Sequence, residues 1–131
     1  MERIIRIHRE LTILAVLIAG VGLSLAGYSS EDVAGAEFFE SKIRPLLTES
    51  CFKCHSHEAK KLKGKLYLDS LQGFLDGGET GPSLVVGNPE KSLFIEAVGY
   101  KNTDLQMPPK TKLTDAQIAD LTEWVKRGAP S

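Results

Sequence analysis

Apolar residues recur at helical spacing along much of the chain. The first such stripe consists of Phe39, Ile43, Leu46 and Leu47. Their spacing of i, i+4, i+7 and i+8 predicts an amphipathic helix from about residue 37 to residue 47. Pro45 lies inside this stripe and cannot donate a hydrogen bond to the carbonyl of Ser41. We therefore expect a kink at Pro45.

The middle of the chain predicts shorter elements. The sequence Leu66-Tyr67-Leu68 alternates like a short strand, which would allow a short two-stranded β element. Asp69 or Ser70 then caps a helix of one or two turns, which the glycines at 77 and 78 end. Asn88 and Pro89 have the residue types of a helix cap and a first helical position, and we expect that helix to end at Gly99.

The last predicted helix has clear start and stop signals. Thr114 and Gln117 have the spacing of a capping box, and Gly128 and Pro130 mark the end of the helix. Its apolar positions include Trp124, and we expect this face to cross the first helix near residue 39. Together these patterns predict an all-α fold for a small domain.

The N-terminal segment reads as a targeting sequence. Three arginines in the first nine residues precede an apolar run of 16 residues, from Leu11 to Ala26, without a charge. This arrangement predicts a signal peptide, with an uncleaved membrane anchor as the alternative. We divide the chain into a targeting segment at residues 1–26, a linker at 27–36 and one domain at 37–131. Either form of the segment predicts export to the periplasm or the outer side of the cytoplasmic membrane.

Charge and composition narrow the function classes. After removal of residues 1–26, 105 residues remain, with 13 basic and 15 acidic side chains. The net charge of −2 gives no sign of nucleic-acid binding. Small exported domains usually need a disulfide or another covalent staple, and this chain has only two cysteines.

Both cysteines lie in the sequence Cys51-Phe52-Lys53-Cys54-His55. This Cys-x-x-Cys-His spacing is typical of covalent haem c attachment, in which two thiols bind the porphyrin and the histidine becomes an iron ligand. A structural zinc site, a thioredoxin-like redox pair and a plain disulfide are the alternatives. The zinc site lacks a fourth ligand, the redox pair lacks a βαβ context, and the disulfide leaves His55 unexplained. We expect one haem.

Two further residues are candidates for the haem site. Met107 is the only methionine besides the initiator, and Pro108 and Pro109 follow it and stiffen the loop. Its thioether is the candidate second iron ligand. The carbonyl of Pro82 is a candidate acceptor for the other ring N–H of His55, although a Gly-Pro pair can equally mark a simple turn.

Sequence motifs across residues 38–130 resemble a planctomycete-type cytochrome c domain, a relative of class I cytochromes c. The matching segments are Cys51–His55, Gly64–Ser70, Gly77–Pro82, Gly87–Leu93, Met107–Pro109 and Trp124–Pro130. The resemblance implies a helical fold around covalent haem c, with His55 and Met107 as axial ligands, and a Gly-Pro carbonyl bonded to the proximal histidine. Such domains often begin much larger proteins.

These observations favour an electron carrier over two other classes of protein. A peroxidase would need an open distal site with histidine or arginine, and the sequence offers no such arrangement. A haem-bearing redox or sensing module that docks to a larger exported enzyme is the main alternative. We expect no catalytic residues, a monomer, a redox partner protein, and possible membrane tethering through residues 11–26.

Overall fold

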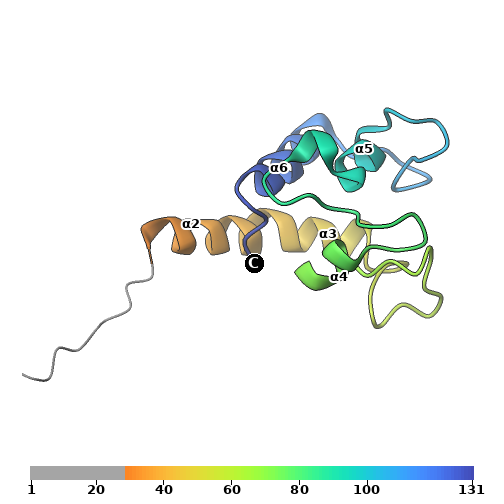
Figure 1. Cartoon of the computed structure of the whole chain (residues 1–131), viewed down its shortest axis with the longest axis horizontal. Helices are drawn as coiled ribbons and strands as arrows, with labels where there is room; N and C mark the ends of the chain where they lie inside the picture. The colour runs from red at the N-terminus through yellow and green to blue at the C-terminus, as the bar shows by residue number, and fades with distance from the viewer. Residues whose placement is uncertain (1–28) are drawn as a thin grey trace, which may run out of the picture.

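The computed structural model describes residues 29–131, and its regular elements are all helical (Figure 1). They are α2 (Ser30–Phe38), η1 (Phe39–Ile43), α3 (Arg44–Ser50), α4 (Leu71–Asp76), η2 (Pro89–Lys91), α5 (Leu93–Gly99) and α6 (Asp115–Lys126). No strand occurs within these residues, so the expected two-stranded element is wrong there. Two isolated bridges, Gly78 with Gly81 and Asn102 with Leu105, are the only β pairings in the described range.

The first three elements form one continuous helical rod from Ser30 to Ser50 (Figure 1). Ser29 starts it with a capping box, because its hydroxyl accepts from Asp32 N–H while the Asp32 carboxylate accepts from Ser29 N–H. Before Pro45 the rod changes to a π-helical turn, in which Arg44 N–H donates to the Phe39 carbonyl. The missing N–H of Pro45 is thus accommodated by a wider turn, and the helix continues into α3.

This rod begins earlier than the apolar stripe predicted. Residues 30–36, which we assigned to a linker, are helical. The targeting segment at residues 1–26 lies outside the described residues. Within residues 29–131, none of the helices has the length and apolar character needed to cross a membrane.

The shorter helices follow their local caps. Ser70 accepts from Gly73 N–H at 3.1 Å and starts α4, as predicted. Asn88 instead caps the 3₁₀ turn η2, and α5 begins only at Leu93. The side chain of Ser92 explains this break: it is 1 % exposed, and its hydroxyl accepts from Val85 N–H and donates to the Asn88 carbonyl. These bonds hold the two sides of the turn together.

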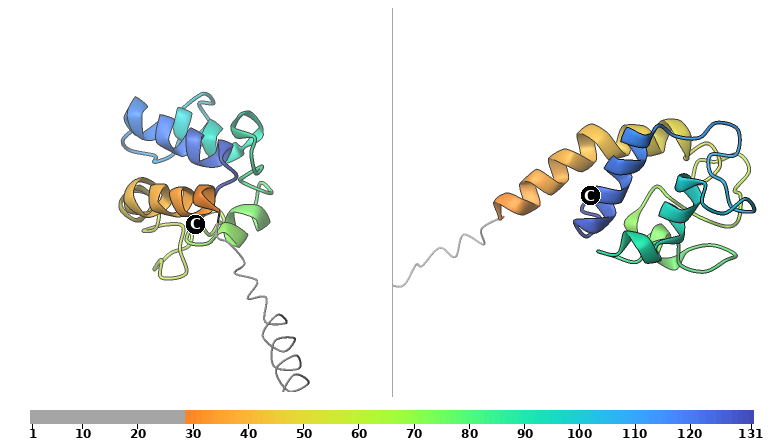
Figure 2. Two further views of the ribbon diagram at one scale, coloured as in Figure 1. Left: turned by 90° about the vertical axis from the view of Figure 1, so that its left-hand side faces the viewer. Right: turned by 90° about the horizontal axis from the view of Figure 1, so that it is seen from above.

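Helix α6 crosses the rod (Figure 2). Aromatic side chains pack at this crossing. The predicted capping box of Thr114 and Gln117 is present. Trp124 is 1 % exposed and has its ring centroid 5.9 Å from that of Phe39 and 5.4 Å from that of Phe74. The predicted crossing near Phe39 is therefore confirmed.

We expect Trp124→Ala to lower the free energy of unfolding by about 3–5 kcal/mol, because it removes a large buried side chain and leaves a cavity. It also removes the indole N–H that donates to the Pro130 carbonyl at 2.8 Å. Denaturant unfolding followed by circular dichroism measures the change. The control is Val33→Ala, at a side chain that is 56 % exposed, for which about 0.5 kcal/mol or less is expected. Equal effects of the two variants would contradict this account of the core.

Candidate cofactor site

A cavity of about 250 Å³ lies between the Cys-x-x-Cys-His turn and α5. Most side chains along its wall are apolar, and they include Leu66, Leu68, Leu93, Phe94, Ala97, Val98 and Leu105. Cys51, Cys54 and His55 line the cavity on one stretch of chain, and Met107 lines it from a loop more than 50 residues later. An apolar cavity with a few convergent polar groups is typical of a cofactor site.

The cysteine turn follows directly from the end of α3. Cys51 is the residue after the last helical position, and its N–H still donates to the Leu47 carbonyl at 2.9 Å. The Cys51 carbonyl then accepts from the N–H groups of Cys54 and His55, at 3.1 and 3.0 Å. This tight turn places both sulfur-bearing residues and the histidine along the same cavity wall.

The two thiols are free but differ in their surroundings. Cys51 is buried and Cys54 is half-buried. Burial raises the pKa of the Cys51 thiol to about 12, so this thiol is protonated at neutral pH and is a poor nucleophile. Bond formation at Cys51 would therefore require the thiol to be reached before this packing is complete.

His55 has an unusual ring environment. Its Nδ1 is buried, with no hydrogen-bond partner in the described part of the chain. An unpaired buried polar group costs about 1–3 kcal/mol. The backbone around this ring is nevertheless well fixed, since the His55 carbonyl accepts from Leu68 N–H at 2.8 Å. The backbone thus holds the ring in place, while its Nδ1 has no hydrogen-bond partner within residues 29–131.

The loop that carries Met107 is attached to α5 at two points. Met107 N–H donates to the Ala97 carbonyl at 3.1 Å, and the Tyr100 hydroxyl donates to the Pro108 carbonyl. Tyr100 has a left-handed backbone (φ 58°), which ends α5 and turns the chain into the loop. The Met107 side chain is 37 % exposed. Its thioether therefore borders both the cavity and solvent.

These residues fit a covalently bound haem. Two free thiols, an imidazole whose Nδ1 is unpaired and a thioether belong to residues that line one apolar cavity, and these are the donor types that c-type haem requires. The alternative zinc site gains no support, because no group of three or more His, Cys, Asp or Glu side chains in residues 29–131 could hold a metal ion.

Residues 51–111 match the family described as Planctomycete cytochrome C. This segment is similar to a planctomycete cytochrome c domain. The matched segment contains all the predicted site residues from Cys51 to Met107 and confirms the resemblance inferred from sequence motifs. No curated protein and no solved structure matched the chain.

The predicted contact between the Pro82 carbonyl and His55 is not formed in this structure. Pro82 is absent from the cavity wall, although its neighbours Gly81 and Ser83 line it. Pro82 packs against Gly77 instead, where an added Cβ would lie 2.6 Å from the Pro82 Cα. The 26 residues between His55 and Pro82 allow this different placement. A Pro82 contact in the haem-bound protein remains a prediction.

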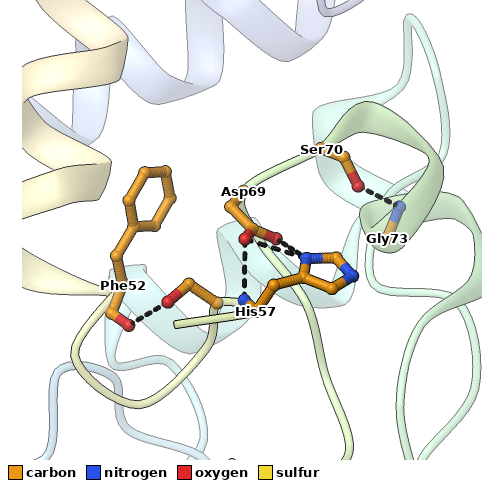
Figure 3. A network of polar contacts seen from close by, with 6 residues as sticks. Phe52, His57, Asp69, Ser70 and Gly73 are labelled. Carbon is orange, nitrogen blue, oxygen red and sulfur yellow. Dashed lines mark hydrogen bonds and ion pairs between the residues drawn. The ribbon is translucent and has the colours of Figure 1, made fainter. Parts of the chain in front are cut away.

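A polar contact that the sequence did not reveal joins His57 to Asp69 within the matched segment (Figure 3). Asp69 accepts from the His57 backbone N–H at 2.7 Å, and His57 Nδ1 lies 2.9 Å from both carboxylate oxygens. Because a carboxylate only accepts, Nδ1 carries the proton. The ring also stacks on Tyr67 at 4.1 Å. Burial raises the pKa of Asp69, but the hydrogen bonds from His57 outweigh this and leave it below its usual range.

Only the spacing of a polar pair 12 residues apart could have indicated the His57–Asp69 contact, and many such pairs never meet. The His57 side chain is 67 % exposed despite this contact. The contact closes the neck of the loop between residues 57 and 69. It therefore fixes the segment that follows the cysteine motif of the cytochrome domain.

Proposed function

We propose that this protein is an exported monohaem c-type cytochrome that transfers electrons, with His55 and Met107 as the axial ligands. The observation that carries the proposal is that Cys51, Cys54, His55 and Met107 all line one apolar cavity. Two of these residues would attach the cofactor, and two would ligate its iron from different parts of the chain.

A haem bound in this cavity would supply a one-electron redox couple. The sulfur atoms of Cys51 and Cys54 would hold the porphyrin covalently, and the turn after α3 would set their separation. His55 would donate an imidazole lone pair, and Met107 a neutral thioether, which favours the ferrous state and raises the reduction potential. The apolar wall would exclude water from the cofactor.

The remaining wall of the cavity supports a carrier rather than an enzyme. Apart from His55, no histidine and no arginine line it in the described part of the chain. Peroxide chemistry would need such a group on the distal side to move a proton and to polarise the oxygen–oxygen bond. Occupation of the sixth position by Met107 would also leave no site for a substrate.

Export is part of the proposal and rests on the N-terminal sequence. The basic head and the apolar run from Leu11 to Ala26 support secretion or a membrane tether. A protein in the periplasm, or one held at the outer side of the cytoplasmic membrane, would meet its redox partner there. The alternative is a haem-bearing redox or sensing module that docks to a larger exported enzyme.

The proposal is tested on protein expressed in a cell with a haem c maturation system. We expect one haem per chain, a reversible one-electron potentiometric titration, and a low-spin optical spectrum with the weak long-wavelength sulfur-to-ferric band. Carbon monoxide should bind poorly and peroxide should turn over slowly. A high-spin protein that binds carbon monoxide readily would contradict the carrier function and favour the sensing module.

A further inference from the structure

A second hollow, which we call the basic groove, adjoins the cofactor cavity. Its cationic side chains are Arg44, Lys53, Lys60, Lys61 and Lys63. Two acidic residues, Glu58 and Asp69, also line it. The proposed electron transfer gives no role to the positive charge of this groove.

The positive charge is strongly localised. Residues 52–65 contain five lysines and one glutamate, a net charge of +4, whereas residues 29–131 as a whole carry −2. The rest of the described chain therefore carries −6. A charge difference of this size across a small domain orients the molecule in the field of a charged partner and raises the rate of productive encounter.

The lysines of the groove are not neutralised within the protein. Lys53, Lys60, Lys61 and Lys63 are exposed, and in residues 29–131 none of the four forms an ion pair with a carboxylate. The Asp69 carboxylate is already engaged by His57 at 2.9 Å. The groove therefore presents an excess of unpaired ammonium groups to solvent.

The groove and the cofactor cavity share part of their walls. Cys54 and Lys63 line both hollows. Cys54 is one of the two residues that would hold the porphyrin, so a molecule bound in the groove would lie directly against the edge of the cofactor site. This adjacency connects the charge of the groove to electron exchange.

The lysine-bearing loop is also held in place before any partner binds. His57 and Asp69 close its neck, as Figure 3 shows, and Lys63 N–H donates to the Cys54 carbonyl at 3.0 Å. A surface fixed in this way loses less conformational entropy on binding than a mobile loop would. The ammonium groups extend from a backbone that is tied to the cysteine turn itself.

We propose that the basic groove docks an acidic surface of the redox partner protein. This inference rests on the proposed electron transfer and names the surface and the partner chemistry for it. A concave site admits protruding carboxylate side chains, whereas a flat anionic membrane would contact only its rim. The groove therefore fits an acidic protein better than a lipid surface.

Binding is tested with the haem-loaded protein and a fluorescein-labelled peptide of ten glutamates as the probe. Lys60→Glu combined with Lys61→Glu should weaken peptide binding at least about tenfold at low ionic strength, and 0.3 M salt should abolish the difference. The control is Lys91→Glu combined with Lys126→Glu, which makes the same change in net charge outside the groove. Equal weakening by both double variants would overturn the proposal, and so would tighter binding to phosphatidylglycerol vesicles than to the peptide.

Electron exchange provides a second readout. Oxidation by anionic hexacyanoferrate(III) should slow about tenfold in the groove variant, and reaction with cationic hexaammineruthenium should become faster, while the control variant changes little. If the haem exchanges electrons but the rates with both reagents are the same in the groove variant and the native protein, the docking proposal is wrong and the proposed function stands. If the haem undergoes no reversible redox change, the proposed function itself fails.

Discussion

Met107→Ala should open the sixth coordination position and lower the reduction potential by at least about 59 mV, which is a tenfold change in equilibrium constant for one electron. The physical reason is that a neutral thioether stabilises ferrous iron. A water molecule in the vacated position would not stabilise the ferrous state to the same extent. The sulfur-to-ferric band should disappear, and carbon monoxide should bind where it bound little before. Optical titration and potentiometry measure all three changes.

Two control variants separate ligation from packing. Met107→Leu keeps a similar side-chain volume without the sulfur, so it should behave like Met107→Ala in ligand binding. Leu105→Ala alters the same cavity wall but keeps the thioether, so its spectrum should remain that of the native protein. A native protein that is indifferent to Met107→Ala would refute methionine ligation.

The double variant Cys51→Ala with Cys54→Ala should lose covalent haem entirely. The haem of the native protein should stay with the polypeptide in acidified organic solvent, and the double variant should release it. We also expect the double variant to be largely unfolded, because a domain whose core is completed by a bound group folds only with that group, as metal-dependent domains do. Solvent extraction and circular dichroism provide the two measurements.

The single variants at Cys51 and Cys54 serve as the graded control. Each retains one thiol and should keep haem attached through one bond, with intermediate stability. The two should differ, since Cys51 is buried at the C-terminal end of α3 and Cys54 is half-buried in the wall of the basic groove. Extraction of haem from the native protein would rule out covalent attachment.

Sequence patterns predicted the helices whose boundaries are set by local chemistry. Helix α6 agrees with its capping box and α4 with its serine cap, because these signals involve residues three positions apart. The first turns of the rod were missed because residues 30–36 have no apolar stripe, although Ser29 and Asp32 carried a capping box. The prediction of a β element was wrong because the Leu68 N–H donates to the His55 carbonyl instead of to a neighbouring strand.

The candidate site was predictable where the chain contains only a few residues of the type that the site requires. Only two cysteines and one non-initiator methionine exist, and the structure places all three at the same cavity. The position of Pro82 relative to His55 depends on the path of the 26 residues between them, and sequence spacing does not determine that path. Predicting the basic groove would have required knowing which charged side chains remain unpaired after folding. The His57–Asp69 contact is one example, because it engages a carboxylate that lines the groove.

The rod from Ser30 to Ser50 sets the separation between the two ends of the molecule. At about 1.5 Å per residue, its 21 residues span about 30 Å. Its first turns project from the domain, and the cysteine turn follows at its other end (Figure 1). If the chain were tethered through the residues before Ser29, the helical rod would act as a rigid spacer. It would hold the basic groove and the cysteine turn well away from the point of attachment. Partners could then approach that end from solution without competing with the tether for space.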